Sequence, residues 1–167
     1  MNNDAKKTAL RMIPYGLYVL TAEAGDDSVA ASTINWATQA SFEPPLVAIG
    51  VKVDSRSHAI VSDSGRFALN VLGKDQKDLA FTFFKPHERE GDTIGGHAFE
   101  RSPGGVPVLT ATPAWVECRV VETLTIGDHS IVVGEVTEAA VRELPEGRAD
   151  DATLWLRDLG ENVFYGG

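Results

Sequence analysis

Short segments rich in β-forming residues recur along most of the chain, and this pattern limits the possible folds more than any other feature. Turns with Gly, Pro or acidic residues separate the segments, and few helical stretches interrupt them. Many short, closely spaced strands favour a small antiparallel barrel. The segments predicted to be strands are 16–21, 29–33, 37–42, 46–51, 66–71, 114–122 and 130–136.

Other segments carry helix or loop signals. Helices are predicted at residues 4–12, 57–63 and 75–84, each ended by Pro or Gly or begun by a capping residue. Residues 22–28 form a polar turn, and the Gly-rich stretch 91–107 is expected to be a long loop that covers a site or moves. The C-terminal region adds a polar turn and two short apolar segments, residues 145–151, 154–156 and 163–165.

The composition indicates one soluble, cytoplasmic domain spanning residues 1–167. A chain of this length with 43% hydrophobic residues can bury a real core. With 24 acidic and 15 basic residues the net charge is −9, and the cations are scattered, so binding to nucleic acid or to an acidic membrane surface is not expected. The sequence has no N-terminal apolar signal core and no apolar run near the roughly 20 residues of a membrane span.

Several common site motifs are absent. Cys118 is the single cysteine, so neither an internal disulfide nor a Cys-based metal site is expected. The four histidines lack the spacing that places two ligands on one helix face, so no metal is expected. The alternative is a metal bound by residues from strands that are distant in sequence. The chain also lacks the P-loop motif of nucleotide-binding proteins and the Gly-x-Ser-x-Gly elbow that holds a hydrolase nucleophile. Neither kind of site is therefore expected.

The segment 30–42, AASTINWATQASF, combines small residues with uncharged polar side chains. Small residues leave the backbone open to a flat ligand, and hydroxyls and amides supply directed hydrogen bonds. The alternative is a barrel strand whose small residues fit a narrow interior. The polar residues concerned are Ser32, Thr33, Asn35, Thr38, Gln39 and Ser41.

The segment 52–58, KVDSRSH, follows an apolar strand and opens a predicted helix. Free N–H groups at a helix start, the hydroxyls of Ser55 and Ser57, and the charges of Lys52 and Arg56 suit a phosphate. The alternative is an ordinary N-cap that binds nothing.

His129 lies where a turn, Gly127-Asp128, enters a strand. Such a histidine can present its imidazole to a cleft, where it donates a hydrogen bond or moves a proton near neutral pH. The alternative is a simple turn residue.

Taken in order, these segments resemble the flavin reductase-like family of FMN-binding split barrels. The most specific pieces are the Ser-x-x-Pro-Pro step at residues 41–45, followed by an apolar strand, and the later Gly-Asp-His at 127–129. The resemblance is carried by GLYVLTA (16–22), ASTINWATQASFEPPLVAIGV (31–51), SRSHAIVSDSGRFALNVL (55–72), DLAFTFFKP (78–86) and GDHSIVVGEV (127–136).

The resemblance implies a mainly β fold, a six-stranded antiparallel split barrel of Greek-key type with flanking helices, usually as a homodimer. In relatives the flavin lies near the dimer interface, with its ring along the segment matching 33–41 and its phosphate near 52–58. His129 would face the nicotinamide or flavin edge as the catalytic candidate. The cofactor-binding candidates are Ser32, Thr33, Asn35, Trp36, Ala37, Thr38, Gln39, Ser41, Lys52, Ser55, Arg56, Ser57, His58 and Lys85.

Two of these positions depart from many relatives. Asn35 and Trp36 stand where smaller or hydroxylated residues are usual, and Trp36 is expected to pack either on the ring or in the dimer core. The tail from residue 151 onward matches the family only loosely.

The implied activity is that of an oxidoreductase that binds FMN, with FAD as an alternative, and takes a hydride from NADH or NADPH. Electrons would pass to free flavin, to a partner monooxygenase or electron-transfer protein, or to another small acceptor. Backbone N–H groups of 36–39 would bind the ring oxygens, and the loop 91–107 would close over nicotinamide. The alternatives are a non-catalytic module for flavin or another flat cofactor, and a structural dimeric barrel with an empty cleft.

Overall fold

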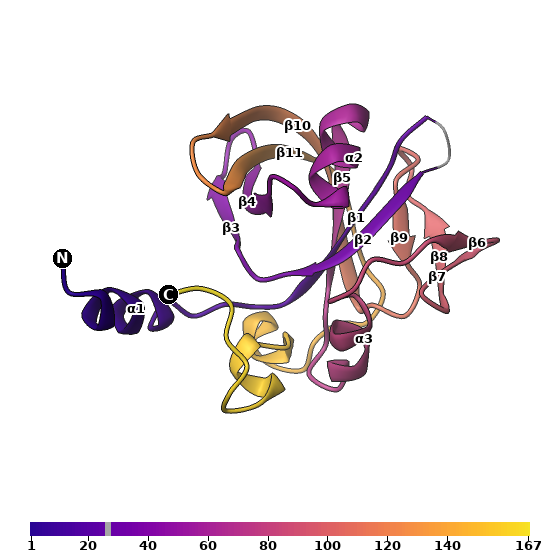
Figure 1. The fold of residues 1–167 in the computed structure, drawn as a ribbon. Helices are drawn as coiled ribbons and strands as arrows, with labels where there is room; N and C mark the ends of the chain where they lie inside the picture. The colour runs from indigo at the N-terminus through magenta and orange to yellow at the C-terminus, as the bar shows by residue number, and fades with distance from the viewer. Residues whose placement is uncertain (26–27) are drawn as a thin grey trace.

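The computed structural model describes residues 1–25 and 28–167 and consists mainly of antiparallel strands (Figure 1). One sheet has seven strands in the order β2-β1-β5-β10-β11-β4-β3, and a second sheet has the order β6-β7-β8-β9. The strands of the larger sheet are β1 Tyr18–Glu23, β2 Val29–Ile34, β3 Ala37–Ser41, β4 Leu46–Lys52, β5 Arg66–Val71, β10 Ala114–Thr125 and β11 His129–Val141.

The predicted mainly β, antiparallel fold is confirmed. The main sheet contains seven strands where six barrel strands were expected, because the short β3 adds to the edge by pairing only with β4. The strands β10 and β11 extend beyond their predicted ends and form a hairpin with two register shifts. The predicted turn at 22–28 includes residues 26 and 27, which lie outside the described residues.

Alternating side chains of β1 enter two different cores. Leu20 and Ala22 pack in the barrel interior with Phe67 of β5 and Ile49 of β4. Val19 points to the opposite face and joins a second core. A strand buried on both faces explains the nearly continuous apolar composition of this segment.

Helix α2, Arg56–Ser64, packs its apolar face onto the barrel interior. Ile60 and Val61 are buried in the same core as β1 and β4. Ser55 caps the helix by accepting a hydrogen bond from the His58 N–H, and Gly65 ends it with a φ of 65°, which glycine adopts without strain. The predicted helix at 57–63 is confirmed, and its start is held rigidly beside β4.

The second core lies under the smaller sheet, whose strands are β6 Arg89–Glu90, β7 Thr93–Ile94, β8 His97–Arg101 and β9 Pro107–Leu109. Helix α3, Lys77–Thr82, and the C-terminal segment complete this core through Ala80, Phe83, Leu154 and Leu156.

The prediction of a long loop at 91–107 was wrong. Ile94 and Phe99 are buried in the second core, and Gly95 and Gly96 both have positive φ in the tight turn that joins β7 to β8. The segment is also fixed to the barrel, because the Gly104 N–H donates to the buried Glu117 carboxylate at 3.0 Å. These contacts hold the segment against the barrel as a small sheet.

Both chain ends lie on one side of the molecule (Figure 1). Helix α1, Asn3–Arg11, buries none of its side chains and projects from the body, and the predicted helix at 4–12 is confirmed. Arg11 lies over the Phe164 ring at 4.2 Å and donates to the Gly166 carbonyl at 3.3 Å. Two 3-10 helices, η1 Ala149–Ala152 and η2 Leu156–Leu159, precede this tail. No helix in the described part of the chain has the length and apolar character needed to cross a membrane.

Candidate functional site

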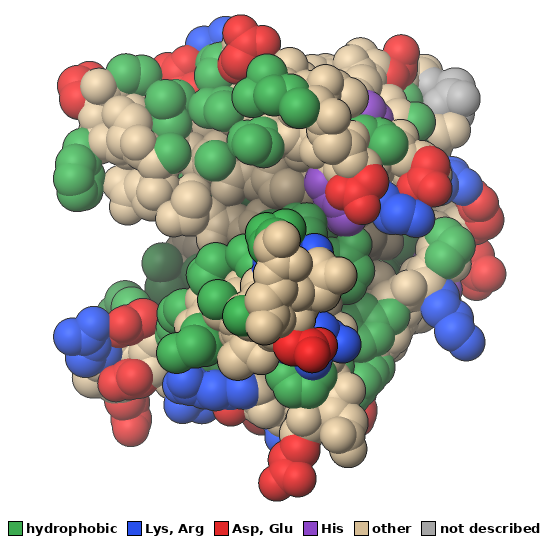
Figure 2. All heavy atoms as spheres, turned by 60° about the vertical axis from the view of Figure 1, so that its left-hand side comes forward, with side chains coloured by type: hydrophobic (Ala, Val, Ile, Leu, Met, Phe, Trp, Pro, Cys, Tyr) green, Lys and Arg blue, Asp and Glu red, His purple; other side chains and the backbone are tan. Residues whose placement is uncertain are grey.

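A cavity of about 470 Å³ opens between β2, the end of β4 and the C-terminal tail. Its volume lies within the range of about 300–1,000 Å³ that is usual for small-molecule sites. In Figure 2 this face is hollowed between the part above, where β3, β4 and β11 lie in Figure 1, and the part below, where hydrophobic side chains gather. The lining residues are Leu17, Ser32, Thr33, Ile34, Asn35, Gly50, Val51, Lys52, Ser55, Phe83, Phe84, His129, Leu156, Val163, Phe164 and Tyr165.

We call this whole space the ring cavity. Its β2 side is polar but uncharged. Thr33 donates through Oγ1 to the Ala80 carbonyl at 2.8 Å, and the buried Asn35 donates through Nδ2 to the Tyr165 carbonyl at 3.2 Å. Among the described residues that line it, none is Asp or Glu. A flat, uncharged ring on this side therefore meets amides and hydroxyls and no carboxylate.

A smaller cavity of about 330 Å³ adjoins the ring cavity and shares Ser32, Ser55 and Phe84 with it. Arg56 and Ser57 line it at the first turn of α2, where backbone N–H groups have no intrahelical acceptor. The Asp54 carboxylate also lines this cavity, but it is paired with Lys52, and the N–H groups and the guanidinium suit an anion. We call this second space the anion cavity.

Both cations of this region are paired with carboxylates. Lys52 Nζ donates to Asp54 Oδ2 at 3.2 Å and lies 3.0 Å from Oδ1, and this hydrogen bond raises the pKa of Lys52. Arg56 binds Glu88 through both of its terminal nitrogens, with Nη2 and Oε2 3.0 Å apart. Lys52 can offer net positive charge to the ring cavity, and Arg56 to the anion cavity, only when the ion pair of that residue opens.

His129 begins β11 and is held from both sides of its ring. Nδ1 lies 3.0 Å from Asp128 Oδ1, and Nε2 lies 2.7 Å from the Tyr165 hydroxyl. The hydrogen bond with His129 lowers the pKa of Asp128, and partial burial raises the pKa of Tyr165. The Trp36 and His129 ring centroids are 4.6 Å apart in an edge arrangement. The imidazole therefore has a fixed orientation at the rim of the ring cavity.

Trp36 lies against β4 because position 50 is glycine. A Cβ at Gly50 would come within 2.9 Å of Trp36 Cε3, so a larger residue would displace the indole. The Gly50 N–H also donates to the Trp36 carbonyl at 2.8 Å. The close approach positions the indole where it also contacts Tyr165, with ring centroids 5.3 Å apart.

The structure brings some of the predicted site residues together. Ser32, Thr33, Asn35, Lys52, Ser55 and His129 line the ring cavity, and Arg56 and Ser57 line the anion cavity with Ser32 and Ser55. The hydroxyls of Ser32 and Ser57 are 2.7 Å apart, which joins β2 to the start of α2.

Other predicted residues lie outside both cavities. Trp36 lines neither cavity, and Ala37, Thr38, Gln39 and Ser41 are on the edge strand β3, so the expected ring contacts of the 36–39 backbone have no support. Lys85 is exposed and lines neither space. The His58 ring lies 2.8 Å from Ser130 Oγ and so points away from the anion cavity. Residues 91–107 line neither cavity, so the expected closure of this segment over nicotinamide has no support.

The tail residues Val163, Phe164 and Tyr165 were missed as site residues. The sequence offered one signal, an apolar segment with two aromatic residues beside the C-terminus. Nothing in that segment alone indicates that it reaches His129, which is 36 positions away.

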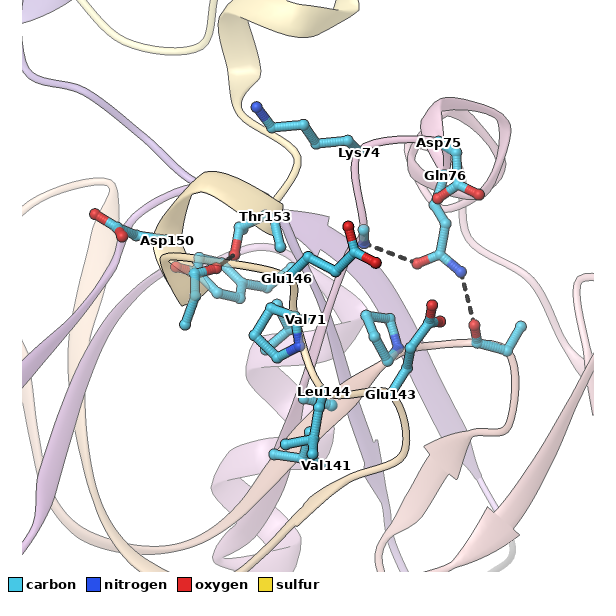
Figure 3. Close-up of a pocket in the computed structure, with 18 residues that line it drawn as sticks. Val71, Lys74, Asp75, Gln76, Val141, Glu143, Leu144, Glu146, Asp150 and Thr153 are labelled. Atoms are coloured by element: carbon cyan, nitrogen blue, oxygen red, sulfur yellow. Dashed lines mark hydrogen bonds between the residues drawn. The ribbon is translucent and has the colours of Figure 1, made fainter.

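A larger cavity of about 680 Å³ lies at a different place, between β5, η1 and the segment after β11 (Figure 3). Asp75, Glu143, Glu146 and Asp150 line it, against one cation, Lys74. This excess of carboxylates opposes a phosphate-bearing ligand. Among the described residues, no group of three or more His, Cys, Asp or Glu is arranged to hold a metal ion.

The donor set fits a flavin mononucleotide. The uncharged β2 wall of the ring cavity suits the isoalloxazine ring, and the adjoining anion cavity, with Arg56 and the start of α2, suits its phosphate. The two spaces share Ser32, Ser55 and Phe84, so they lie side by side at the start of α2.

A small antiparallel split barrel with a site for a flat, anionic cofactor is the class that these features define. The family model described as "Flavin reductase like domain" matches residues 10–158. The chain belongs to this family.

Similar proteins cover most of this chain. The NADH-dependent flavin reductase StyB of Pseudomonas fluorescens is 31% identical over 90% of this chain and 84% of its own. The FMN reductase (NADH) SmoA of Agrobacterium fabrum is 34% identical over 85% and 79%, respectively. The structure of the styrene monooxygenase flavin reductase from Pseudomonas putida S12 has a TM-score of 0.70 and 32% identity, covering 85% of this chain and 88% of its own.

Other relatives are considerably longer. The chain spans 42% of a probable flavin reductase and 56% of the stachydrine N-demethylase reductase subunit Stc3, both from Rhizobium meliloti, at 32% and 31% identity.

Proposed function

We propose that this protein is an FMN-binding NAD(P)H:flavin oxidoreductase formed by one domain over residues 1–167. The observation that carries the proposal is that the ring cavity, which no carboxylate of the described residues lines, lies beside the anion cavity at the start of α2 and shares Ser32, Ser55 and Phe84 with it. Relatives named NADH-dependent flavin reductase and FMN reductase (NADH) support it. FAD is the alternative flavin, and NADPH the alternative donor.

The first group of residues binds the ring. Ser32, Thr33 and Asn35 place uncharged polar side chains along one wall. The Thr33 hydroxyl and the Asn35 amide nitrogen donate to protein carbonyls, so the oxygens of these side chains are the groups that can accept a hydrogen bond from the ring. Phe84 and Leu156 supply apolar surface on other parts of the wall. When bound, the flavin supplies the hydride and electron chemistry of the reaction.

The second group of residues binds the phosphate. Arg56 supplies a guanidinium that can donate two parallel hydrogen bonds, and Ser55 and Ser57 add hydroxyls. Lys52 adds charge from the end of β4. The His58 N–H donates to Ser55 and its ring binds Ser130, so His58 supports the first turn of α2 and does not itself contact the phosphate. Lys85 lines neither cavity and stays outside the proposed phosphate site.

His129 lies where the nicotinamide of the hydride donor is proposed to bind. Asp128 holds Nδ1, so Nε2 is the nitrogen that faces Tyr165 and the cavity rim. The Tyr165 and Trp36 rings both pack against the imidazole, with ring centroids 5.9 Å and 4.6 Å from it. In this arrangement His129 donates or accepts one hydrogen bond at a fixed point.

A homodimer would complete the site. The edge strand β3 exposes Thr38 and Gln39, and the Phe42 side chain that follows it is 89% exposed. An exposed edge with free backbone groups and a large apolar side chain suits burial against another chain. A second copy at this edge would place Ala37, Thr38, Gln39 and Ser41 in an interface, as expected for a flavin bound there.

The electron acceptor is proposed to be free flavin or a partner monooxygenase or electron-transfer protein in the cytoplasm. One similar structure is titled as the flavin reductase of styrene monooxygenase, which supports a partner of that kind. The net charge of −9 makes nucleic acid and acidic membrane surfaces poor partners.

An anaerobic mixing experiment tests the proposal. The protein with added FMN is mixed with NADH, and separately with NADPH, while absorbance near the flavin band is followed. We expect the flavin to bleach with at least one donor and its colour to return on admitting oxygen. Flavin that binds but never bleaches would indicate a non-catalytic binding module, and failure to bind FMN would indicate a structural barrel.

A further inference from the structure

We propose that Glu88 is a specificity-determining residue that weakens binding of the flavin phosphate by competing with it for Arg56. The inference rests on the proposed flavin function and adds to it a residue that no sequence motif indicated. It predicts a site in which the ring contributes most of the binding and the flavin exchanges readily.

The geometry shows that Glu88 takes the position of an anionic ligand. Its two carboxylate oxygens bind the two terminal nitrogens of Arg56, the same bidentate pattern that a phosphate uses. Glu88 comes from the segment after α3, 32 residues from Arg56, so the pair is not a consequence of local sequence. His87 and Pro86, next to Glu88, line the anion cavity itself.

The four charged side chains of the two ion pairs beside the anion cavity sum to zero. Lys52 is balanced by Asp54 and Arg56 by Glu88. A phosphate that approaches therefore meets no net positive charge from these four side chains, in a protein whose total is −9. To bind the phosphate, Arg56 must release the Glu88 carboxylate. The displaced carboxylate then lies near the phosphate and repels it.

The pair is exposed enough to open. The Glu88 side chain is 73% exposed and the Arg56 side chain 36%, so Glu88 can rotate into solvent. Exposed ion pairs contribute little stability. The exchange therefore lowers affinity for a phosphate-bearing flavin without blocking it, and riboflavin, which has no phosphate, is not affected.

Flavin titration of matched variants tests the inference. Dissociation constants for FMN and for riboflavin are measured by fluorescence on the wild type, Glu88→Gln, Glu90→Gln and the double variant Arg56→Ala/Glu88→Gln, with Arg56→Ala for comparison. Glu90→Gln removes the same charge from an exposed position two residues further on.

We expect Glu88→Gln to bind FMN about three- to fivefold more tightly, the scale of an exposed ion pair. Riboflavin affinity should not change, and Glu90→Gln should change neither. Glu88→Gln should have no effect on FMN in the Arg56→Ala background.

Three results would overturn the inference. The first is an unchanged ratio of the FMN and riboflavin dissociation constants in Glu88→Gln. The second is weaker FMN binding in Glu88→Gln, and the third is an equal gain in FMN affinity from Glu90→Gln. If the wild type and all variants bind neither flavin, the proposed function fails and the inference fails with it. If the wild type binds both flavins and Glu88→Gln leaves the ratio of the two dissociation constants unchanged, the inference fails and the proposed function stands.

Discussion

The Tyr165 hydroxyl and His129 Nε2 lie 2.7 Å apart, although 36 residues separate them in sequence. This contact joins the C-terminal tail to the start of β11. The Tyr165 ring also packs against Trp36, and its carbonyl accepts from Asn35. The tail is therefore a wall of the ring cavity, tied to it by hydrogen bonds and ring contacts.

Tyr165→Phe removes this hydroxyl and keeps the ring. We expect NADH oxidation to slow by about two- to tenfold, since a single neutral hydrogen bond contributes about 0.5–1.5 kcal/mol. FMN affinity should stay close to that of the wild type. Steady-state kinetics and an FMN titration check this, with Tyr165→Ala as the variant that also loses the packing on Trp36. A loss of FMN affinity in Tyr165→Phe as large as the loss of rate would contradict a role through His129.

His129→Ala removes the side chain that Asp128 and Tyr165 orient. We expect it to slow NAD(P)H oxidation more than it weakens FMN binding, because the imidazole faces the rim of the cavity. Asp128→Asn should give a smaller loss, since its amide still accepts a hydrogen bond from Nδ1. Unchanged turnover in His129→Ala would make His129 a turn residue.

Arg56→Ala removes the guanidinium from the anion cavity. We expect FMN binding to weaken by about 1.5–3 kcal/mol, the scale of a hydrogen bond to a charged group. Riboflavin binding should be nearly unchanged. Equal losses for the two flavins in a fluorescence titration would place the phosphate elsewhere.

Cys118 lies fully buried in the barrel core, and burial raises the pKa of its thiol to about 12. The native protein should therefore not react with a thiol reagent at pH 8, whereas the unfolded chain should react with one equivalent. Because the folded pKa is above the unfolded value, this group favours the folded state at neutral pH and ceases to do so as the pH rises from about 9 toward 12. Rapid labelling without denaturant would contradict this burial.

Much of the fold was predictable from the sequence. Segments such as 66–71 alternate clearly, and the structure places Phe67 in the barrel core and Asn70 on the other face, where it bonds to the Leu109 N–H at 2.7 Å. The small sheet β6–β9 was not predictable, because its strands have two to five residues, too few to show a period. Its paired glycines indicated a loop, although Gly95-Gly96 is a hairpin turn.

The site was predictable where its residues are close in sequence. Ser55 and Arg56 carry the signal of a helix start beside a cation, and both line the anion cavity. Glu88 and Tyr165 were not predictable, because each acts through a contact made across more than thirty residues. Local pattern gives no information on such pairs, and only the packing of α3 and the tail brings them to the site.

A crystal structure of the protein with FMN tests the central claim most directly. We predict the ring in the cavity between Thr33, Gly50 and Tyr165, with the phosphate at Ser55 and Arg56 and the Glu88 carboxylate displaced. FMN density in the acidic cavity beside Glu143, or no density in the presence of excess FMN, would contradict the account.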